Sequence, residues 1–263
     1  GGFPLMTFDV REFARTARGS HRGEMDLSAV DASAVDADAA RLIRVLRDLE
    51  NSTMHRMRNL LVTATHKDAR VTAFLTTWAF EKFWVADALT AVLEASGHPT
   101  DAADGMLRTS RVERADRRGP VARAIAGNLA GPKLVAAHVT IGLVDEWVTS
   151  AAYRRLGELA TALRGVVTMV LEIKDRHIEF LGDEAQRRLA ESARARRLTL
   201  KTVAQTAWPV GATERPAEER TFFETIVFGG PEGSSRASEI ASRIAALPGL
   251  GPVAPTVAAR LVP

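Results

Sequence analysis

The stretch from residue 78 to residue 97, WAFEKFWVADALTAVLEASG, repeats apolar side chains at three- and four-residue steps, with one lysine among them. This spacing places side chains on one face of a helix. The residues concerned are Trp78, Lys82, Val85, Leu89 and Val92. A lysine inside an apolar stripe extends its amine to solvent, is paired with a carboxylate, or takes part in chemistry. The stretch therefore predicts a core helix whose one charge needs a partner.

Three other long segments show the helical period, and each also carries charge on its apolar face. They are residues 39–65 with Glu50, the segment after residue 132 with Glu146, and the segment after residue 165 with Lys174 and His177. A charge in a helix stripe is stable in a core only when a neighbouring element supplies its partner. The four segments together predict an all-α four-helix bundle in which these side chains converge.

The chain divides into an arm at residues 1–38, the bundle at 39–208, and accessory helices with a Pro-rich tail at 209–263. Asp68 is placed to cap the second long helix, and Gly97 is placed to end it. A long connection then leads to the third helix. It holds a charged run at residues 111–118 and a short apolar helix near residues 121–129.

Composition excludes several classes of site. With no cysteine, the strong metal ligands left to the chain are Glu, Asp and His. A net charge of +3 with acids among the arginines predicts no nucleic-acid partner. No apolar run reaches the roughly 18 residues that span a bilayer, and the first residues lack the order of a signal peptide. We therefore expect a cytoplasmic protein without a membrane span, and a homodimer is one possible assembly.

Four long helices with a long link between the second and third are typical of the ferritin-like bundle, in which carboxylates and histidines meet in the core. The local sequence also resembles that family, specifically the acyl-carrier desaturases and their diiron relatives. The second helix of those proteins reads roughly W-x-x-E-E-x-x-H. The matching positions of this chain hold Trp78, Glu81, Lys82 and Val85. The resemblance implies that Lys82 and Val85 replace a metal-binding Glu and His.

The fourth helix of the family carries D-E-x-R-H, and this chain has IKDRHIEFLG. Arg176 and His177 are kept, whereas Lys174 stands where the family has a ligand Glu. Glu50 and Glu146 match the two single-Glu positions. Two irons need about four carboxylates to balance their charge, and two ammonium groups would repel them. The resemblance therefore implies a ferritin-like bundle that has lost its diiron site and uses no metal cofactor.

These residues suggest a metal-independent enzyme that acts on an apolar small molecule or a carrier-bound substrate through acid–base or amine chemistry. The candidate catalytic residues are Lys82, Lys174, Glu50, Glu146 and His177. The candidate pocket residues are Trp78, Glu81, Trp84, Val85 and Tyr153. His138, two turns before Glu146, is expected to be a structural histidine, and His55 lies off the inward stripe of its helix.

Two alternatives remain open from the sequence. In the first, the charges form only a core network in a non-catalytic binding or scaffold protein. In the other alternative, the helix that contains residues 78–97 is rotated by one residue, so that Glu81 points inward in place of Lys82. Glu172 or Asp175 would then supply a carboxylate from the fourth helix to an iron or manganese pair.

Overall fold

The computed structural model describes residues 7–100 and 131–263, which form helices joined by turns, with no strand in those two ranges. The bundle consists of α2 (Ala37–Asn51), α3 (Thr53–Leu61), α4 (Ala69–Ala95), α7 (Pro132–Leu159) and α8 (Arg164–Glu191). The remaining helices are α1 (Val10–Arg15), α9 (Ala193–Gln205), α10 (Ala217–Phe228), α11 (Gly230–Ala245) and α12 (Ala254–Leu261). The predicted all-α class is confirmed. The charged run at 111–118 and the apolar helix near 121–129 lie outside the described residues.

The ends of α4 follow from its sequence. The Asp68 side chain accepts a hydrogen bond from the Val71 N–H at 2.9 Å and so caps the first turn. At the other end, Gly97 takes a φ of +70°, a left-handed conformation that suits glycine. The N–H groups of Gly97 and His98 then donate to the carbonyls of Glu94 and Leu93. Both predicted ends of this helix are confirmed.

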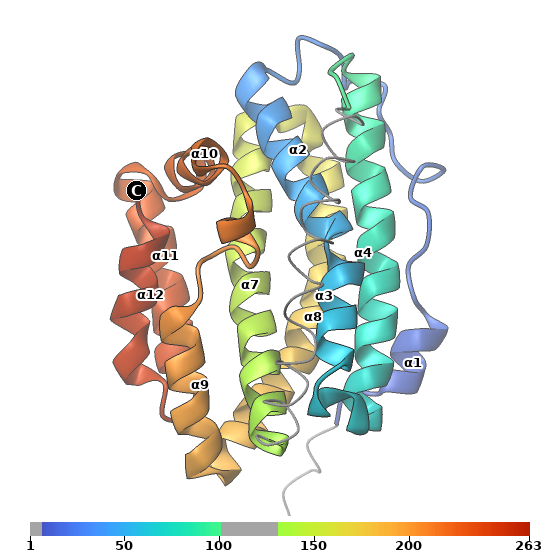
Figure 1. Ribbon diagram of the computed structural model, residues 1–263. Helices are drawn as coiled ribbons and strands as arrows, with labels where there is room; N and C mark the ends of the chain where they lie inside the picture. The colour runs from blue at the N-terminus through green and yellow to red at the C-terminus, as the bar shows by residue number, and fades with distance from the viewer. Residues whose placement is uncertain (1–6, 101–130) are drawn as a thin grey trace, which may run out of the picture.

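The predicted helix at residues 39–65 is in fact two helices, so that prediction is wrong in its middle. The chain leaves the helical path at Ser52, whose hydroxyl donates to the Leu49 carbonyl at 2.7 Å. Serine competes for backbone carbonyls in this way and weakens a helix interior. A short 3-10 helix, Ala64–Lys67, follows α3. The break moves α3 away from the straight continuation of α2 (Figure 1).

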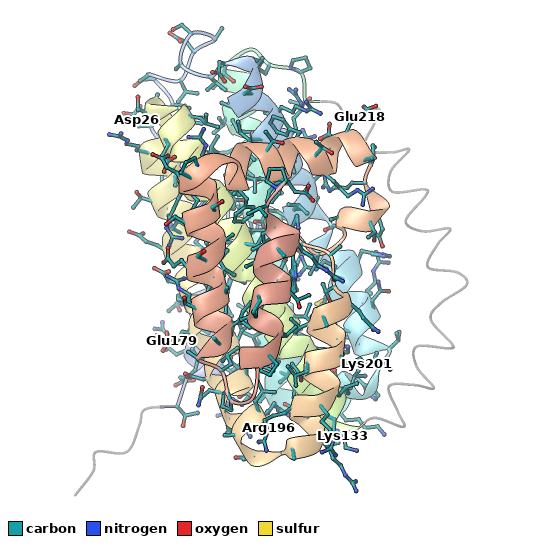
Figure 2. All side chains as sticks on the ribbon, turned by 90° about the vertical axis from the view of Figure 1, so that its left-hand side faces the viewer. Asp26, Lys133, Glu179, Arg196, Lys201 and Glu218 are labelled. Atoms are coloured by element: carbon teal, nitrogen blue, oxygen red, sulfur yellow. The ribbon has the colours of Figure 1, made fainter. Side chains whose placement is uncertain are left out.

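Helices α2, α4, α7 and α8 lie side by side, while α9, α11 and α12 pack on the other side of α7 (Figure 1). One continuous group of buried apolar side chains runs through both parts. The segment at 254–261, expected to be tail, forms α12 and buries Val257 and Leu261. Figure 2 looks onto this side, where α10 crosses above α11 and α12 and Glu218 and Lys201 point outward.

The N-terminal arm packs on the bundle. Its Phe8 and Phe13 rings contact Phe180 and Phe74, which come from α8 and α4. Arg176 holds the end of α1 by donating to the Thr16 hydroxyl at 2.7 Å. The arm therefore covers the edge of the bundle between α4 and α8. None of the helices in the described ranges is both long enough and apolar enough to cross a membrane.

Candidate functional site

Four buried charged side chains from four helices meet in the bundle: Glu50 of α2, Lys82 of α4, Glu146 of α7 and Lys174 of α8. We call them the charged cluster. The Lys82 Nζ atom lies 2.6 Å from Oε1 of Glu146 and 3.3 Å from Oε2 of Glu50. The Lys174 Nζ atom lies 2.6 Å from Oε2 of Glu146 and 3.8 Å from Oε1 of Glu50. Each lysine thus bridges the same two carboxylates, and the formal charges cancel.

Two neutral donors complete the charged cluster. The Tyr153 hydroxyl donates to Oε1 of Glu50 at 2.9 Å, and the Trp78 indole N–H donates to Oε1 of Glu146 at 3.1 Å. Both side chains are buried. Hydrogen bonds to a buried carboxylate stabilise its charged form. The two carboxylates are therefore held by ammonium groups and by neutral donors at once.

Burial and neighbouring charges act in opposite directions on the cluster. Burial alone raises the pKa of Glu50 and of Glu146, but the two adjacent ammonium groups more than offset it, so both pKa values are lowered. For Lys82 burial lowers the pKa, whereas its two carboxylate neighbours raise it above the ordinary value. For Lys174 burial prevails, and its pKa is lowered. Lys174 is thus the more easily deprotonated of the two amines.

His177 belongs to a neighbouring pair rather than to the charged cluster. Its Nε2 atom lies 2.9 Å from Oε1 of Glu81, whose Oε2 accepts the backbone N–H of Arg18 at 2.7 Å. Burial lowers the pKa of His177, which favours the neutral ring. The structure therefore brings together four of the five predicted catalytic residues, and His177 makes its hydrogen bond to Glu81.

Glu81 and Lys82 were alternatives for the inward-facing charged position of α4, and in the structure both point inward, toward different neighbours. Both side chains are buried: Lys82 faces the carboxylates of α2 and α7, and Glu81 faces α8 and the arm. The alternative metal site built on Glu81 also needed a carboxylate from α8. That part of the prediction is wrong, because Glu172 and Asp175 are exposed. They cannot supply a carboxylate to the core.

The residues of the charged cluster do not fit a metal pair. The carboxylate oxygens already face two ammonium groups, and the nearby hydroxyl and indole present hydrogens rather than lone pairs. A cation placed there would have to displace Lys82 or Lys174. In the two described ranges, no group of three or more His, Asp or Glu side chains has the arrangement to hold a metal ion.

A cavity of about 270 Å³ lies beside the charged cluster, between α3, α4, α7 and the loop before α10. Most of its wall is apolar. Its lining residues from the described ranges are Ser52, His55, Arg56, Asn59, Leu60, Thr65, Val71, Phe74, Leu75, Trp78, His138, Val139, Ile141, Gly142, Leu181, Val210, Gly211 and Glu214. Among the described residues, Trp78 is the one that both lines this cavity and donates a hydrogen bond to the charged cluster. Its indole ring therefore lies between the two.

The polar part of the cavity wall was not predicted from the sequence. Arg56 is paired with the buried Asp145 at 3.1 Å, and Asp145 also accepts the Val210 N–H at 2.8 Å. These contacts tie the loop before α10 to the bundle. On the other side, the Thr65 hydroxyl oxygen lies 2.9 Å from Nδ1 of His138. The signal available in the sequence was the position of His138 on the inward side of its helix.

Only part of the predicted pocket lines this cavity. Trp78 does, whereas Glu81, Val85 and Tyr153 are buried elsewhere in the bundle. Trp84 is partly exposed on α4, where its ring contacts the edges of Phe80 and Phe83. The cavity follows the first half of α4 because the break at Ser52 shifts α3 there, and this break was not predicted.

Comparisons of the chain with protein-family models, with curated proteins and with solved structures gave no match.

Proposed function

We propose that the chain binds an uncharged, mainly apolar small molecule in the cavity beside Trp78, and that the charged cluster supports the fold around it. This proposal is supported by the separation of the cavity from the charged cluster. The cavity wall contains neither lysine of the cluster, and both ammonium groups already lie between carboxylates. Apolar cavities with a few placed polar groups are the usual form of small-molecule sites.

The size of the cavity supports a compact ligand. A volume of 270 Å³ equals the bulk volume of about nine water molecules. An engineered apolar cavity of roughly 150 Å³ stays dry and takes up benzene. A molecule with one ring and a short substituent therefore matches the space next to Phe74, Leu75 and Val139.

We also propose that the bundle is a ferritin-like one, metal-independent, in which the charged cluster stands in place of a diiron centre. Two features support this relationship. The cluster takes one side chain from each of four long helices, and a long segment separates the second of these from the third. That is the arrangement in which ferritin-like bundles place their ligands.

Calorimetric titration with ethylbenzene tests the binding function. A side chain added at Gly142 meets the cavity residue Leu181 at 3.5 Å, so Gly142→Val narrows the cavity. We expect this variant to weaken ethylbenzene binding roughly tenfold or more, the effect of one methylene too many in a tight pocket. Gly182→Val is the matched control, because it also replaces a helical glycine but faces Leu143 outside the cavity. Failure of the unmodified protein to bind ethylbenzene would overturn the proposal.

A second candidate is an enzyme that uses the Lys174 amine, favoured by the pKa that burial lowers. A neutral amine adds to an aldehyde and loses water to give an imine, which borohydride reduces to a secondary amine. Mass spectrometry after treatment with benzaldehyde and borohydride would then find the benzyl group on Lys174 in preference to the exposed Lys201. Labelling of exposed lysines alone would exclude this candidate.

A further inference from the structure

The pair formed by Thr65 and His138 is a polar contact in an otherwise apolar part of the cavity wall. Thr65 comes from the short 3-10 helix after α3, and His138 comes from α7. Both residues line the cavity, and the Thr65 hydroxyl oxygen is 2.9 Å from Nδ1 of His138. The charged cluster does not use this pair. It is therefore available to a ligand.

We assign the ring proton by making the Thr65 hydroxyl the donor and Nδ1 of His138 the acceptor. Burial lowers the pKa of His138 from 6.5 to about 4, so the ring is neutral at pH 7 and carries one N–H. Within residues 7–100 and 131–263, the acceptor that the Thr65 hydroxyl proton reaches is Nδ1 of His138. When that hydroxyl donates to Nδ1, the ring proton resides on Nε2. The hydrogen bond that these residues give His138 is the one at Nδ1, and it leaves Nε2 out.

We infer that the Nε2–H group of His138 donates a hydrogen bond to the ligand, and that the ligand is a neutral molecule with a carbonyl-type acceptor, such as a ketone or an ester. The inference rests on the proposed binding function and specifies its ligand class. Thr65 is a positioning residue, since it fixes which ring nitrogen carries the proton.

The charges around the cavity favour a neutral ligand over an anion. Arg56 is the cationic side chain among the described lining residues, and Asp145 already neutralises it at 3.1 Å. The exposed carboxylate of Glu214, in the short 3-10 helix Ala212–Glu214, adds negative charge at the edge of the cavity. Among the described lining residues, a carboxylate ligand would find no cation without a counter-ion and would lose its hydration, which is unfavourable. A carbonyl group needs only one donor.

A matched pair of probes tests the inference, because acetophenone and ethylbenzene have nearly the same shape and differ by a carbonyl oxygen. We would titrate both into the unmodified protein, His138→Leu and Thr65→Val. The expected result is a loss of acetophenone affinity of about threefold to tenfold in His138→Leu, the value of one hydrogen bond, with ethylbenzene affinity kept. Thr65→Val has nearly the shape of threonine, so it serves if His138→Leu does not fold. It should reduce acetophenone affinity by a smaller factor.

The outcomes separate this inference from the function on which it rests. If neither probe binds the unmodified protein, the binding function itself is wrong. If ethylbenzene binds but both variants change the two affinities equally, the cavity binds ligands and the carbonyl contact is refuted. Selective loss of acetophenone affinity in His138→Leu, or in Thr65→Val alone, supports the hydrogen bond.

Discussion

The charged cluster and the cavity both lie against α4 and α7 and share the indole of Trp78, yet they are opposite in character. In the charged cluster, two ammonium groups pair with two carboxylates, and two neutral donors bond to the same carboxylates. In the cavity, the wall is mostly apolar, and within residues 7–100 and 131–263 His138 makes its hydrogen bond through Nδ1 and not through Nε2. A site whose groups are all engaged stabilises a fold, whereas a hollow with an unengaged donor can receive a molecule.

The strongest test of this contrast removes one charge from the cluster. Lys82→Met should destabilise the protein by about 3–5 kcal/mol, because it leaves the buried carboxylate of Glu50 without its closest cation. Adding Glu50→Gln should recover most of that loss, since it restores neutrality and keeps an acceptor for Tyr153. Chemical denaturation of both variants measures the effect. An unchanged free energy of unfolding in Lys82→Met would contradict the cluster's supporting role.

The next test concerns the cavity and depends on pH. The folded-state pKa of His138 is about 4 and its ordinary value is 6.5, so the unfolded chain binds more protons between these values. Stability should therefore fall as the pH drops from 6.5 to 4, by at most about 3 kcal/mol from this residue. The lowered pKa of His177 adds to the same slope.

His138→Gln isolates the contribution of His138, because it keeps hydrogen-bonding capacity and removes the titration. The variant should have a shallower fall in the free energy of unfolding over this pH range than the unmodified protein. Parallel curves for the two proteins would show that the partly buried position of His138 does not lower its pKa.

Trp78 contacts both the charged cluster and the cavity, and changing it should have a smaller effect on stability. Trp78→Phe removes the N–H donated to Glu146, which should cost about 1–2 kcal/mol of stability. The same change enlarges the cavity, so ethylbenzene should still bind. Trp84→Phe is the matched control, because Trp84 lies on the same helix and its indole N–H has no hydrogen-bond partner among the described residues. The stability of this variant should stay within about 0.5 kcal/mol of the unmodified protein. Loss of ethylbenzene binding in Trp78→Phe would mean that the indole itself holds the ligand.

The sequence predicted the helices and the charged cluster because both follow from the three- and four-residue spacing of apolar side chains within each segment. Charged residues on apolar stripes need partners, and the four long helices place Glu50, Lys82, Glu146 and Lys174 at the same level. The capping of α4 by Asp68 and its end at Gly97 were equally local signals. The metal-independent function remains a proposal.

The cavity could not be predicted, because it depends on departures from regular helix geometry. The break at Ser52 turns α3, and the buried Asp145 draws the loop at Val210 against the bundle. Neither contact follows from the hydrophobic period. The positions of His138 and Arg56 in the cavity wall therefore depend on tertiary packing. The hydrogen bond between His177 and Glu81 depends on it as well.

The most direct test of the separation between the two regions is a crystal structure with bound bromobenzene, in which anomalous scattering locates the bromine atom. We expect a bromine peak inside the cavity, near Phe74, Leu75 and Val139, with the charged cluster unchanged. A bromine peak among Glu50, Lys82 and Lys174, or no peak at saturating bromobenzene, would contradict it.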